Sequence, residues 1–314
     1  MSIKDLDQKH AVRYEVVDAA SSGQRVDNFL VKVLKGVPKS RIYRMLRKGE
    51  VRVDGRRIKP TRRLAAGESV RIPPVVSNAA TAARPPAGYV EALEARIITE
   101  TDDYLALDKP TGMAVHGGSG VRLGLIETLR ASRSGFLELV HRLDRDTSGV
   151  LLLAKSRTAL TELHKAFRER ATAKHYRLVV HGQWQGGART VRHRLHRFVT
   201  ASGERRVRVQ DDGRGAQTVF TPLEVTPTLS CLQAELITGR THQARVHALA
   251  EGHPIVGDDK YVPERLRAAE VNVHAGRLML HAESLRIVIG GERVRFTAAV
   301  PQAFEALMAG SRRP

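Results

Sequence analysis

The sequence predicts an α+β protein: a small unit of two helices and a hairpin, followed by a larger domain with a largely antiparallel mixed β-sheet flanked by helices. Alternating apolar segments come in neighbouring runs and not in strict strand–helix–strand order, which favours antiparallel pairing. A stretch at 74–90, rich in proline, alanine, serine and threonine, separates the two regions and has the composition of a linker. A chain of 314 residues is long enough for two domains.

The first region contains local signals for two helices and a hairpin. Residues 1–22 are polar and predict a flexible N-terminus. Apolar residues at helical spacing begin at Val26 and predict an amphipathic helix. A second helix is predicted from Ser40 to Gly49, since glycine is favoured just beyond a helix C-terminus. The pair Asp54-Gly55 predicts a tight turn between two short strands.

The second region mixes strand and helix patterns. Amphipathic segments predict helices near 158–170 and 241–251. Predicted strands cover 97–98, 104–107, 176–180, 232–237, 285–289 and 294–296. The predicted organisation is therefore a flexible N-terminus at 1–22, a small domain of helices and a hairpin at 23–73, a linker at 74–90 and a larger domain at 91–310.

The charge of the chain predicts a polyanionic partner. The formal net charge is +19, which points to nucleic acid. Between Lys32 and Arg71 there are 14 lysines and arginines against 3 acidic residues, a net charge of +11. The candidates for RNA contacts in this segment are Arg41, Arg44, Arg47, Lys48, Arg52, Arg56 and Arg57. A second basic strip, also predicted to contact RNA backbone, comprises Arg189, Arg192, Arg194, Arg197, Arg205, Arg206 and Arg208.

Cysteine content and hydropathy predict a cytoplasmic protein. Cys231 is the single cysteine, so no internal disulfide can form, and its apolar alternating surroundings predict a buried small side chain. The N-terminal residues lack the apolar core of a signal peptide, and no apolar run approaches the length that crosses a membrane. An amphipathic basic helix or lipidation motif, which would indicate a membrane surface as partner, is not found either.

Three polar islands surround apolar runs in the second region. They are LDKPTGMAVHGG at 107–118, HRLDRDTSGVLLLAK at 141–155 and TGRTHQARVH at 238–247. The apolar run at 150–154 predicts a buried strand. Carboxylates at the entrance of such a strand would lie at the rim of a core, where a charge is costly unless it has a partner or a task. The second island therefore predicts an active site on a rigid element.

These motifs resemble two known families. Residues 23–73, through Ser40–Ile42 and Arg47–Gly55, resemble the S4 RNA-binding domain. The three islands, above all HRLDRDTSG followed by LLLAK, resemble the pseudouridine synthases of the RluA family. The layout is most similar to the RluC type, which isomerises three uridines of the large-subunit (23S) ribosomal RNA, and the RluD type stays open. The resemblance implies large-subunit ribosomal RNA as partner, a monomer, and neither cofactor nor metal.

The resemblance also assigns roles to individual residues. It makes Asp144 the catalytic carboxylate, either as nucleophile at C1′ or as the base that draws a ribose proton to give a glycal. Arg240 matches the family's guanidinium that keeps this carboxylate ionised. Tyr176 matches the active-site tyrosine, whose ring can stack on the flipped uracil. Arg142 matches the wedge at the place that the extruded base leaves. Asp146 is interpreted as structural.

Other classes of function fit the sequence less well. A non-catalytic RNA-binding or ribosome-assembly protein would explain the charge but gives no reason for the second island. A zinc-dependent base deaminase needs cysteine ligands that are absent, and a methyltransferase needs a glycine-rich cofactor turn that is not found. The histidine pairs are interpreted as RNA contacts or surface imidazoles and not as metal ligands: His193 with His196, and His242 with His247.

Overall fold

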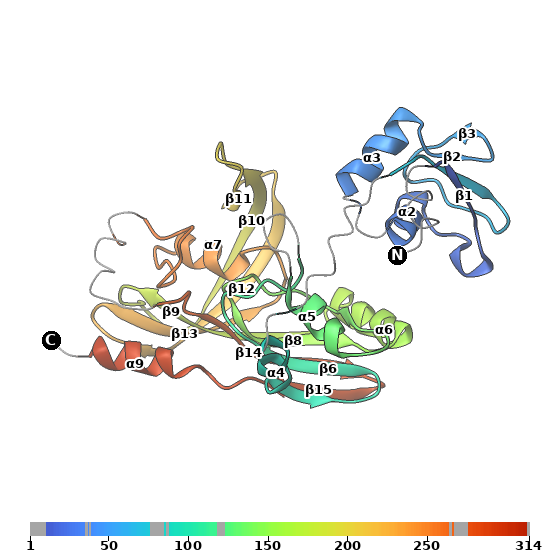
Figure 1. The fold of residues 1–314 in the computed structure, drawn as a ribbon. Helices are drawn as coiled ribbons and strands as arrows, with labels where there is room; N and C mark the ends of the chain where they lie inside the picture. The colour runs from blue at the N-terminus through green and yellow to red at the C-terminus, as the bar shows by residue number, and fades with distance from the viewer. Residues whose placement is uncertain are drawn as a thin grey trace. The chain divides into compact units, whose positions relative to one another are not determined.

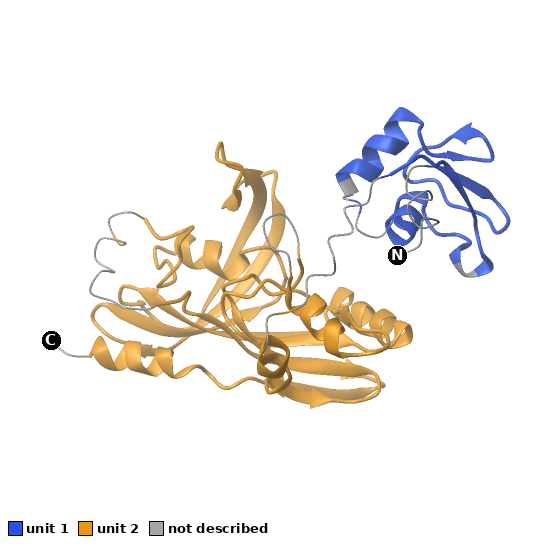
Figure 2. Ribbon diagram, in the orientation of Figure 1, with its two compact units in different colours: residues 1–83 blue, residues 84–314 orange. Residues whose placement is uncertain are grey.

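The chain forms two compact units, residues 1–83 and 84–314 (Figure 2). The computed structural model describes residues 11–34, 37, 39–75, 85, 88–117, 123–263, 266 and 276–312. Most of the predicted linker at 74–90 lies outside the described residues. The predicted boundaries 23–73 and 91–310 stay predictions. Among the described residues, no helix is long and apolar enough to cross a membrane.

The first unit places two helices against a small antiparallel sheet. Helix α2 (Val26–Val33) and helix α3 (Lys39–Lys48) agree with the two predicted helices. The sheet has the order β1-β4-β2-β3 and consists of β1 (Arg13–Val16), β4 (Ser69–Ile72), β2 (Arg52–Val53) and β3 (Arg56–Arg57). Apolar side chains of the helices and strands form one buried cluster, which includes Val26, Leu30, Ile42, Met45, Val53, Val70 and Ile72.

Local chemistry fixes the hairpin of this unit, and pairing fixes its N-terminal strand. Asp54 and Gly55 have φ angles of 46° and 76°, as the predicted two-residue turn requires. The prediction of a flexible N-terminus is wrong for residues 13–17. Strand β1 pairs with β4 from Arg13 to Val16, and Val17 is 1% exposed, because pairing and burial outweigh the polar composition. Residues 1–10 lie outside the described residues.

The second unit is built on one mixed, largely antiparallel sheet (Figure 1). Its main path has the order β11-β10-β12-β13-β9-β14-β8-β6-β5, and β15 pairs with β14 while β7 pairs with β8. The strands are β5 (Ile97–Glu100), β6 (Tyr104–Lys109), β7 (Glu138–Leu139), β8 (Ser148–Ala154), β9 (Thr172–His181), β10 (Arg189–Val199), β11 (Arg205–Val209), β12 (Arg214–Val225), β13 (Leu229–Leu236), β14 (Leu280–Ile289) and β15 (Glu292–Thr297). Among the described strands, only β14 and β8 run parallel.

Helices cover parts of this sheet. They are α4 (Tyr89–Glu94), α5 (Leu125–Ser132), α6 (Arg157–Arg168), α7 (Gln243–Ala250) and α9 (Gln302–Gly310), of which α6 and α7 agree with the predicted helices. Strand β8 is buried at every position, as predicted. Leu151 and Leu153 pack in the cluster with α4 and α5, whereas Val150 and Leu152 pack in the cluster with α6. This alternation follows from the two-residue period of a strand.

A glycine at the start of β8 permits its contact with β14. Gly149 has φ 109°, and a Cβ atom there would lie 2.2 Å from the backbone oxygen of Ala282. Gly135 has φ 97° and open space around the same position. We expect Gly149→Ala to lower the free energy of unfolding by about 1–3 kcal/mol more than Gly135→Ala, since only the first adds a backbone clash to the strain of a positive φ. Urea denaturation measures both, and equal losses would contradict the expectation.

Candidate active site

Residues of the first polar island form hydrogen bonds to the turn that contains Asp144. The amide of Thr147 donates to the carbonyl of Asp144 at 3.2 Å and closes this turn just before β8. Lys109, at the end of β6, pairs with Gly149 across the ladder. The hydroxyl of Thr111 donates to the carbonyl of Asp146 at 2.7 Å. Two segments more than 30 residues apart are therefore joined at the base of the Asp144 turn.

The ammonium of Lys109 makes the central contact of this arrangement. It is 0% exposed, and Nζ donates to the carbonyls of Pro110 at 2.8 Å, Met113 at 2.7 Å and Arg145 at 2.9 Å. Burial lowers the pKa of Lys109 to about 8. The negative charges of Asp146 and Asp144 act in the opposite direction and limit this decrease. The group is still mostly protonated at neutral pH, and its three N–H donors match the three acceptors.

A cavity of about 280 Å³ opens beside the Asp144 turn. Its lining residues come from all parts of the predicted site: His141, Arg142, Leu143, Asp144, Thr147, Phe167, Lys174, Tyr176, Arg197, Leu236, Gly239, Arg240, Thr241, His242, Gln243, Ala244, Arg245 and Leu280. This volume lies at the small end of the range for sites that bind small molecules. It suits a single nucleotide better than a duplex. No group of three or more His, Cys, Asp or Glu side chains within the described ranges is arranged to hold a metal ion.

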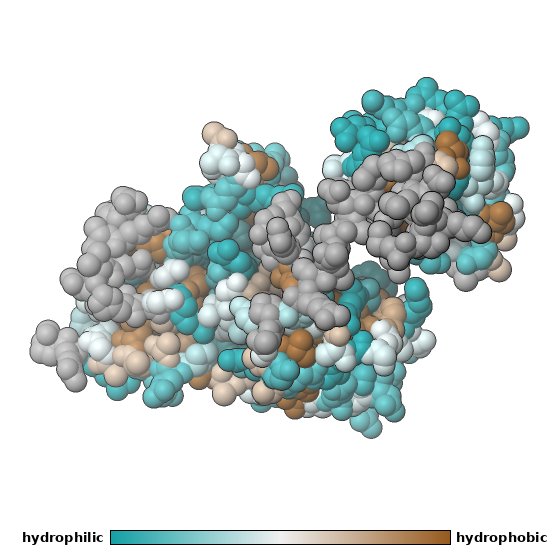
Figure 3. Space-filling view, in the orientation of Figure 1, coloured by the Kyte–Doolittle hydropathy of each residue, from teal (hydrophilic) through white to brown (hydrophobic). Residues whose placement is uncertain are grey.

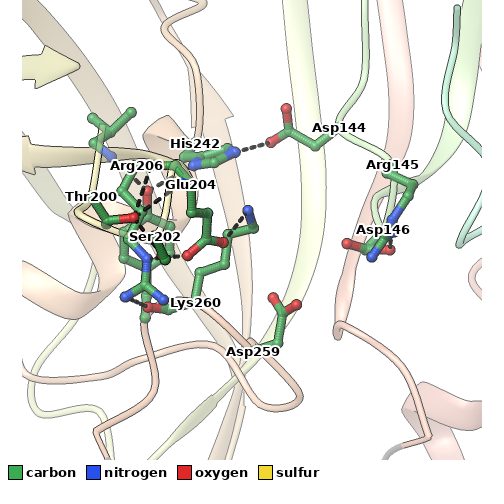
Figure 4. Close-up of polar contacts among 12 residues, drawn as sticks. Asp144, Arg145, Asp146, Thr200, Ser202, Glu204, Arg206, His242, Asp259 and Lys260 are labelled. Atoms are coloured by element: carbon green, nitrogen blue, oxygen red, sulfur yellow. Dashed lines mark hydrogen bonds and ion pairs between the residues drawn. The ribbon is translucent and has the colours of Figure 1, made fainter. Parts of the chain in front are cut away.

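A histidine lies next to the Asp144 carboxylate (Figure 4). His242 Nε2 is 3.8 Å from Asp144 Oδ2, and the His242 side chain is 11% exposed. The hydroxyl of Tyr261 accepts the amide of Val207 at 2.9 Å and lies 2.7 Å from His242 Nδ1. Burial raises the pKa of Tyr261 to about 12, so the hydroxyl keeps its proton while it forms its hydrogen bond with Nδ1. Burial also lowers the pKa of His242, and the negative charge of Asp144 acts in the opposite direction. Burial thus favours the neutral ring, whose Nε2 faces the Asp144 carboxylate.

The guanidinium of Arg245 lies next to Tyr261, the hydrogen-bond partner of His242. Arg245 is 2% exposed, and it forms a two-pronged pair with Asp258 through Nε–Oδ2 at 2.7 Å and a terminal nitrogen–Oδ1 at 2.6 Å. Its guanidinium also lies over the Tyr261 ring, 5.1 Å from the centroid. Burial lowers the pKa of Arg245, but the pairing with Asp258 and the charge of Asp144 raise it overall. The buried positive charge of Arg245 thus interacts favourably with the Asp144 carboxylate.

Arg240 does not make the predicted contact with Asp144. It lines the same cavity, but its Nε donates to the carbonyl of Gly215 at 3.2 Å, and among the described residues Arg240 itself forms no ion pair with Asp144. The reason is that Arg240 precedes α7 and points towards β12, whereas Arg245 lies in the first turn of that helix and is buried. In place of the contact predicted for Arg240, the structure has His242 3.8 Å from Asp144, while the buried Arg245 interacts with Asp144 through its charge.

The other predicted site residues lie around the same cavity. Tyr176 projects from β9, and burial raises the pKa of its phenol, with a further increase from the charge of Asp144. Its hydroxyl therefore stays protonated at neutral pH. Arg142 is exposed at the cavity wall. Asp146 pairs with Arg145 at 3.0 Å and points away from Asp144 (Figure 4), in keeping with its interpretation as structural.

Ion pairs hold the β10–β11 hairpin to the segment that carries Tyr261. Glu204 accepts from Lys260 Nζ at 2.6 Å and from Arg206 Nε at 2.7 Å, as Figure 4 shows. These hydrogen bonds lower the pKa of Glu204 to about 2. Strands β10 and β11 are absent from the sequence prediction, which treats them as a basic strip. In that strip Arg189 and Arg206 already pair with carboxylates.

The predicted RNA-contact residues of the first unit lie on α3 and the β2–β3 hairpin. The exposed members are Arg44, Arg47, Lys48, Arg52, Arg56 and Arg57, whereas Arg41 is half-buried and lies 4.0 Å from Glu50. The surface over α3 is hydrophilic in Figure 3. Backbone carbonyls hold some of these side chains in place, since Arg57 donates to Arg47 at 3.0 Å. The unit presents a fixed basic face.

A basic chain with a carboxylate at the rim of a one-nucleotide cavity has the features of an RNA-modifying enzyme. A family model described as RNA pseudouridylate synthase matches residues 103–250, and a model of the S4 domain matches residues 24–70. The chain is 47% identical over 303 residues to ribosomal large subunit pseudouridine synthase C of Salmonella typhimurium, covering 94% of this chain and 95% of that protein. Identity to the Escherichia coli (strain K12) protein of the same name is 48% over 287 residues, with 90% of each covered. The chain belongs to the RNA pseudouridylate synthase family.

Solved structures agree with this fold. Human RNA pseudouridylate synthase domain containing 1 matches with a TM-score of 0.61 and 28% identity, over 72% of this chain and 90% of that one. Human RNA pseudouridylate synthase domain containing 4 matches in fold with a TM-score of 0.58 and 24% identity, over 71% and 95%. The predicted α+β class and the predicted family are confirmed.

Five residues of the site are missing from the predicted set: Lys109, His242, Arg245, Asp258 and Tyr261. All but Tyr261 lie within the polar islands or just beyond them. The islands therefore predict where the site is but not which of their residues form it. Of the two interpretations of His242 and His247, as RNA contacts or as surface imidazoles, the second is wrong, because the His242 side chain is 11% exposed and His247 is 0% exposed. The first stays a prediction.

The buried pair predicts a large loss of stability. We expect Arg245→Met to lower the free energy of unfolding by about 3–5 kcal/mol, because Asp258 would remain buried without its partner. The double variant Arg245→Met with Asp258→Met should recover most of this loss, and Arg240→Met should cost under about 1 kcal/mol. Urea denaturation of the full chain measures all three. A loss for Arg240→Met equal to that for Arg245→Met would contradict the assignment.

A buried imidazole predicts a loss of stability in acid. The amide of Leu152 donates to His141 Nε2 at 3.1 Å, the ring stacks on Phe167, and burial lowers the pKa of His141 to about 4. The unfolded chain therefore binds more protons between pH 6.5 and 4, so the stability present above pH 6.5 falls as the pH approaches 4. We expect His141→Gln to remove up to about 3 kcal/mol of this dependence. Denaturation at several pH values measures it, and the exposed control His164→Gln should change nothing.

Proposed function

We propose that this protein isomerises specific uridines of large-subunit ribosomal RNA to pseudouridine, with Asp144 as the catalytic carboxylate. The observation that carries the proposal is the position of Asp144 in a cavity of about 280 Å³, beside His242 and Arg245. The ribosomal large subunit is named for the relatives in Salmonella typhimurium and Escherichia coli. The RluC type is favoured over the RluD type by these relatives, and the three uridines of that type are the expected targets.

The reaction needs no oxidant, reductant or water. The N1–C1′ bond breaks, the uracil turns over, a C5–C1′ bond forms, and the C5 proton is lost while N1 gains one. One carboxylate is sufficient either as nucleophile at C1′ or as base towards the ribose. Both routes use the carboxylate form of Asp144, with the imidazole of His242 3.8 Å away and a favourable interaction with the charge of Arg245. The protein thus supplies position and electrostatics.

The cavity requires the uridine to leave the helix stack. Only an extruded nucleotide can enter a space of about 280 Å³, and extrusion costs a few kcal/mol, least in a loop. Tyr176 offers its ring for stacking on the uracil and keeps its hydroxyl proton. Arg142, exposed at the wall of the cavity, takes the place that the base leaves. The basic face of the first unit supplies affinity for the RNA backbone: Arg41, Arg44, Arg47, Lys48, Arg52, Arg56 and Arg57. The enzyme acts as a monomer in the cytoplasm, where ribosomal subunits assemble.

The Asp144 carboxylate is tested by one isosteric change. Purified wild type and Asp144→Asn are given unmodified large-subunit ribosomal RNA, and pseudouridine is mapped by carbodiimide-stop sequencing. We expect wild type to form pseudouridine, and Asp144→Asn to form none while it retains RNA affinity, because the amide can neither attack C1′ nor accept the ribose proton. Asp146→Asn is the matched control two residues away and should remain active.

Each other outcome has a clear meaning. Pseudouridine formed by Asp144→Asn would remove this residue from the reaction. RNA binding without modification by wild type would favour a non-catalytic RNA-binding protein. The mapped positions also distinguish the RluC type from the RluD type.

A further inference from the structure

A second cavity adjoins the one that contains Asp144. Its volume is about 240 Å³, and Arg197, Arg240 and Thr241 line both cavities. The remaining lining residues come from β10, β11, the turn before β12 and the first residue of β12: Leu195, His196, Val207, Asp212, Gly213 and Arg214. Two cavities that share lining residues can accept neighbouring groups of one extended ligand.

The second cavity has an excess of free positive charge. Arg197 and Arg214 are exposed, and within the described part of the chain neither side chain has an ion pair or hydrogen bond. Arg240 uses only its Nε, on the carbonyl of Gly215 at 3.2 Å. The one carboxylate in the lining, Asp212, already pairs with His196 at 2.8 Å. Three guanidinium groups therefore lack a carboxylate partner.

The sheet places two of these arginines on one face. Arg214 on β12 lies directly opposite Leu195 on β10, and Arg197 follows Leu195 by two residues. Side chains two residues apart share a face of a strand, so Arg197 and Arg214 project to the same side. The turn between β11 and β12 is held by Arg194, whose Nε donates to the carbonyl of Gly213 at 3.0 Å. The arrangement is thus built into the backbone.

We propose that the second cavity binds the backbone phosphate that links the target uridine to its neighbour, with Arg197, Arg214 and Arg240 as ligands. This rests on the proposed function, since it places RNA in the first cavity. An extruded uridine stays joined to the strand through its phosphates, so one phosphate lies at the edge of the uridine cavity, where Arg197 and Arg240 are shared. The guanidinium fork matches phosphate oxygens. In this arrangement Arg240 binds the RNA backbone and does not interact with Asp144.

Salt dependence tests the phosphate site. The affinity of the full-length protein for an unmodified large-subunit RNA transcript is measured between 50 and 300 mM salt. We expect Arg197→Gln and Arg214→Gln each to reduce the slope of log affinity against log salt by about 0.7, or about fivefold in affinity at 0.1 M salt. KM should rise more than kcat falls. Arg293→Gln removes the same charge from an exposed position on β15, outside both cavities, and should leave the slope unchanged.

Neutral linkages locate the phosphate. In RNA fragments with a mapped target uridine, single methylphosphonates replace each neighbouring linkage in turn. We expect that one methylphosphonate linkage weakens wild-type binding about as much as the Arg214→Gln substitution does. The same linkage should weaken binding of the Arg214→Gln variant little further. The proposal would be overturned if the effect of every methylphosphonate linkage simply added to that of Arg214→Gln. It would also be overturned if the salt-dependence slopes of Arg197→Gln and Arg214→Gln equalled that of Arg293→Gln. If wild type forms no pseudouridine, the proposed function fails, yet the slopes still decide whether these arginines bind phosphate.

Discussion

The site depends on one buried ammonium group. An isolated charge in a protein interior is strongly unfavourable unless every donor finds an acceptor. Lys109 satisfies its three donors with carbonyls from two segments, Pro110 and Met113 on one side and Arg145 on the other. The charge that would otherwise destabilise the core thereby fixes the turn that contains Asp144. In return the carboxylates of this turn favour the protonated lysine. Stability and site geometry are therefore coupled through the same group.

The sequence was sufficient where the information is local. The pair Asp54-Gly55 determines its own turn, and the run at 150–154 shows by composition that it is buried. Strand β10 was not predicted, because its buried positions are few and lie between arginines. Val191 belongs to the main core cluster, and Leu195 packs with Val246 and Tyr261, which lie more than 50 residues further along. Only the tertiary fold brings those partners to the strand, so no local pattern reveals it.

The sequence alone also could not decide which of two arginines in the site, Arg240 or Arg245, is buried. Arg240 and Arg245 stand in one island, both before or within the first turn of α7. Which guanidinium is buried depends on Asp258, which follows 13 residues after Arg245. The sequence could predict that a guanidinium serves the carboxylate, but the identity of that residue depends on where the helix begins. In the structure Arg245 is the buried guanidinium, paired with Asp258, whereas Arg240 lies at the cavity wall and donates to the carbonyl of Gly215.

The backbone of His242 explains why the imidazole lies where it does. Its φ of 52° and ψ of 21° are left-handed, which costs a residue with a side chain about 1 kcal/mol or more. The hydrogen bond to Tyr261 helps to offset this cost and fixes the ring. The 3.8 Å between Nε2 and Asp144 exceeds hydrogen-bond length, so His242 does not occupy the lone pairs of that carboxylate oxygen. A shorter contact would engage the oxygen in a hydrogen bond, and a longer one would weaken the electrostatic interaction between the two groups. The strained backbone at His242 thus sets the distance between the imidazole and the carboxylate.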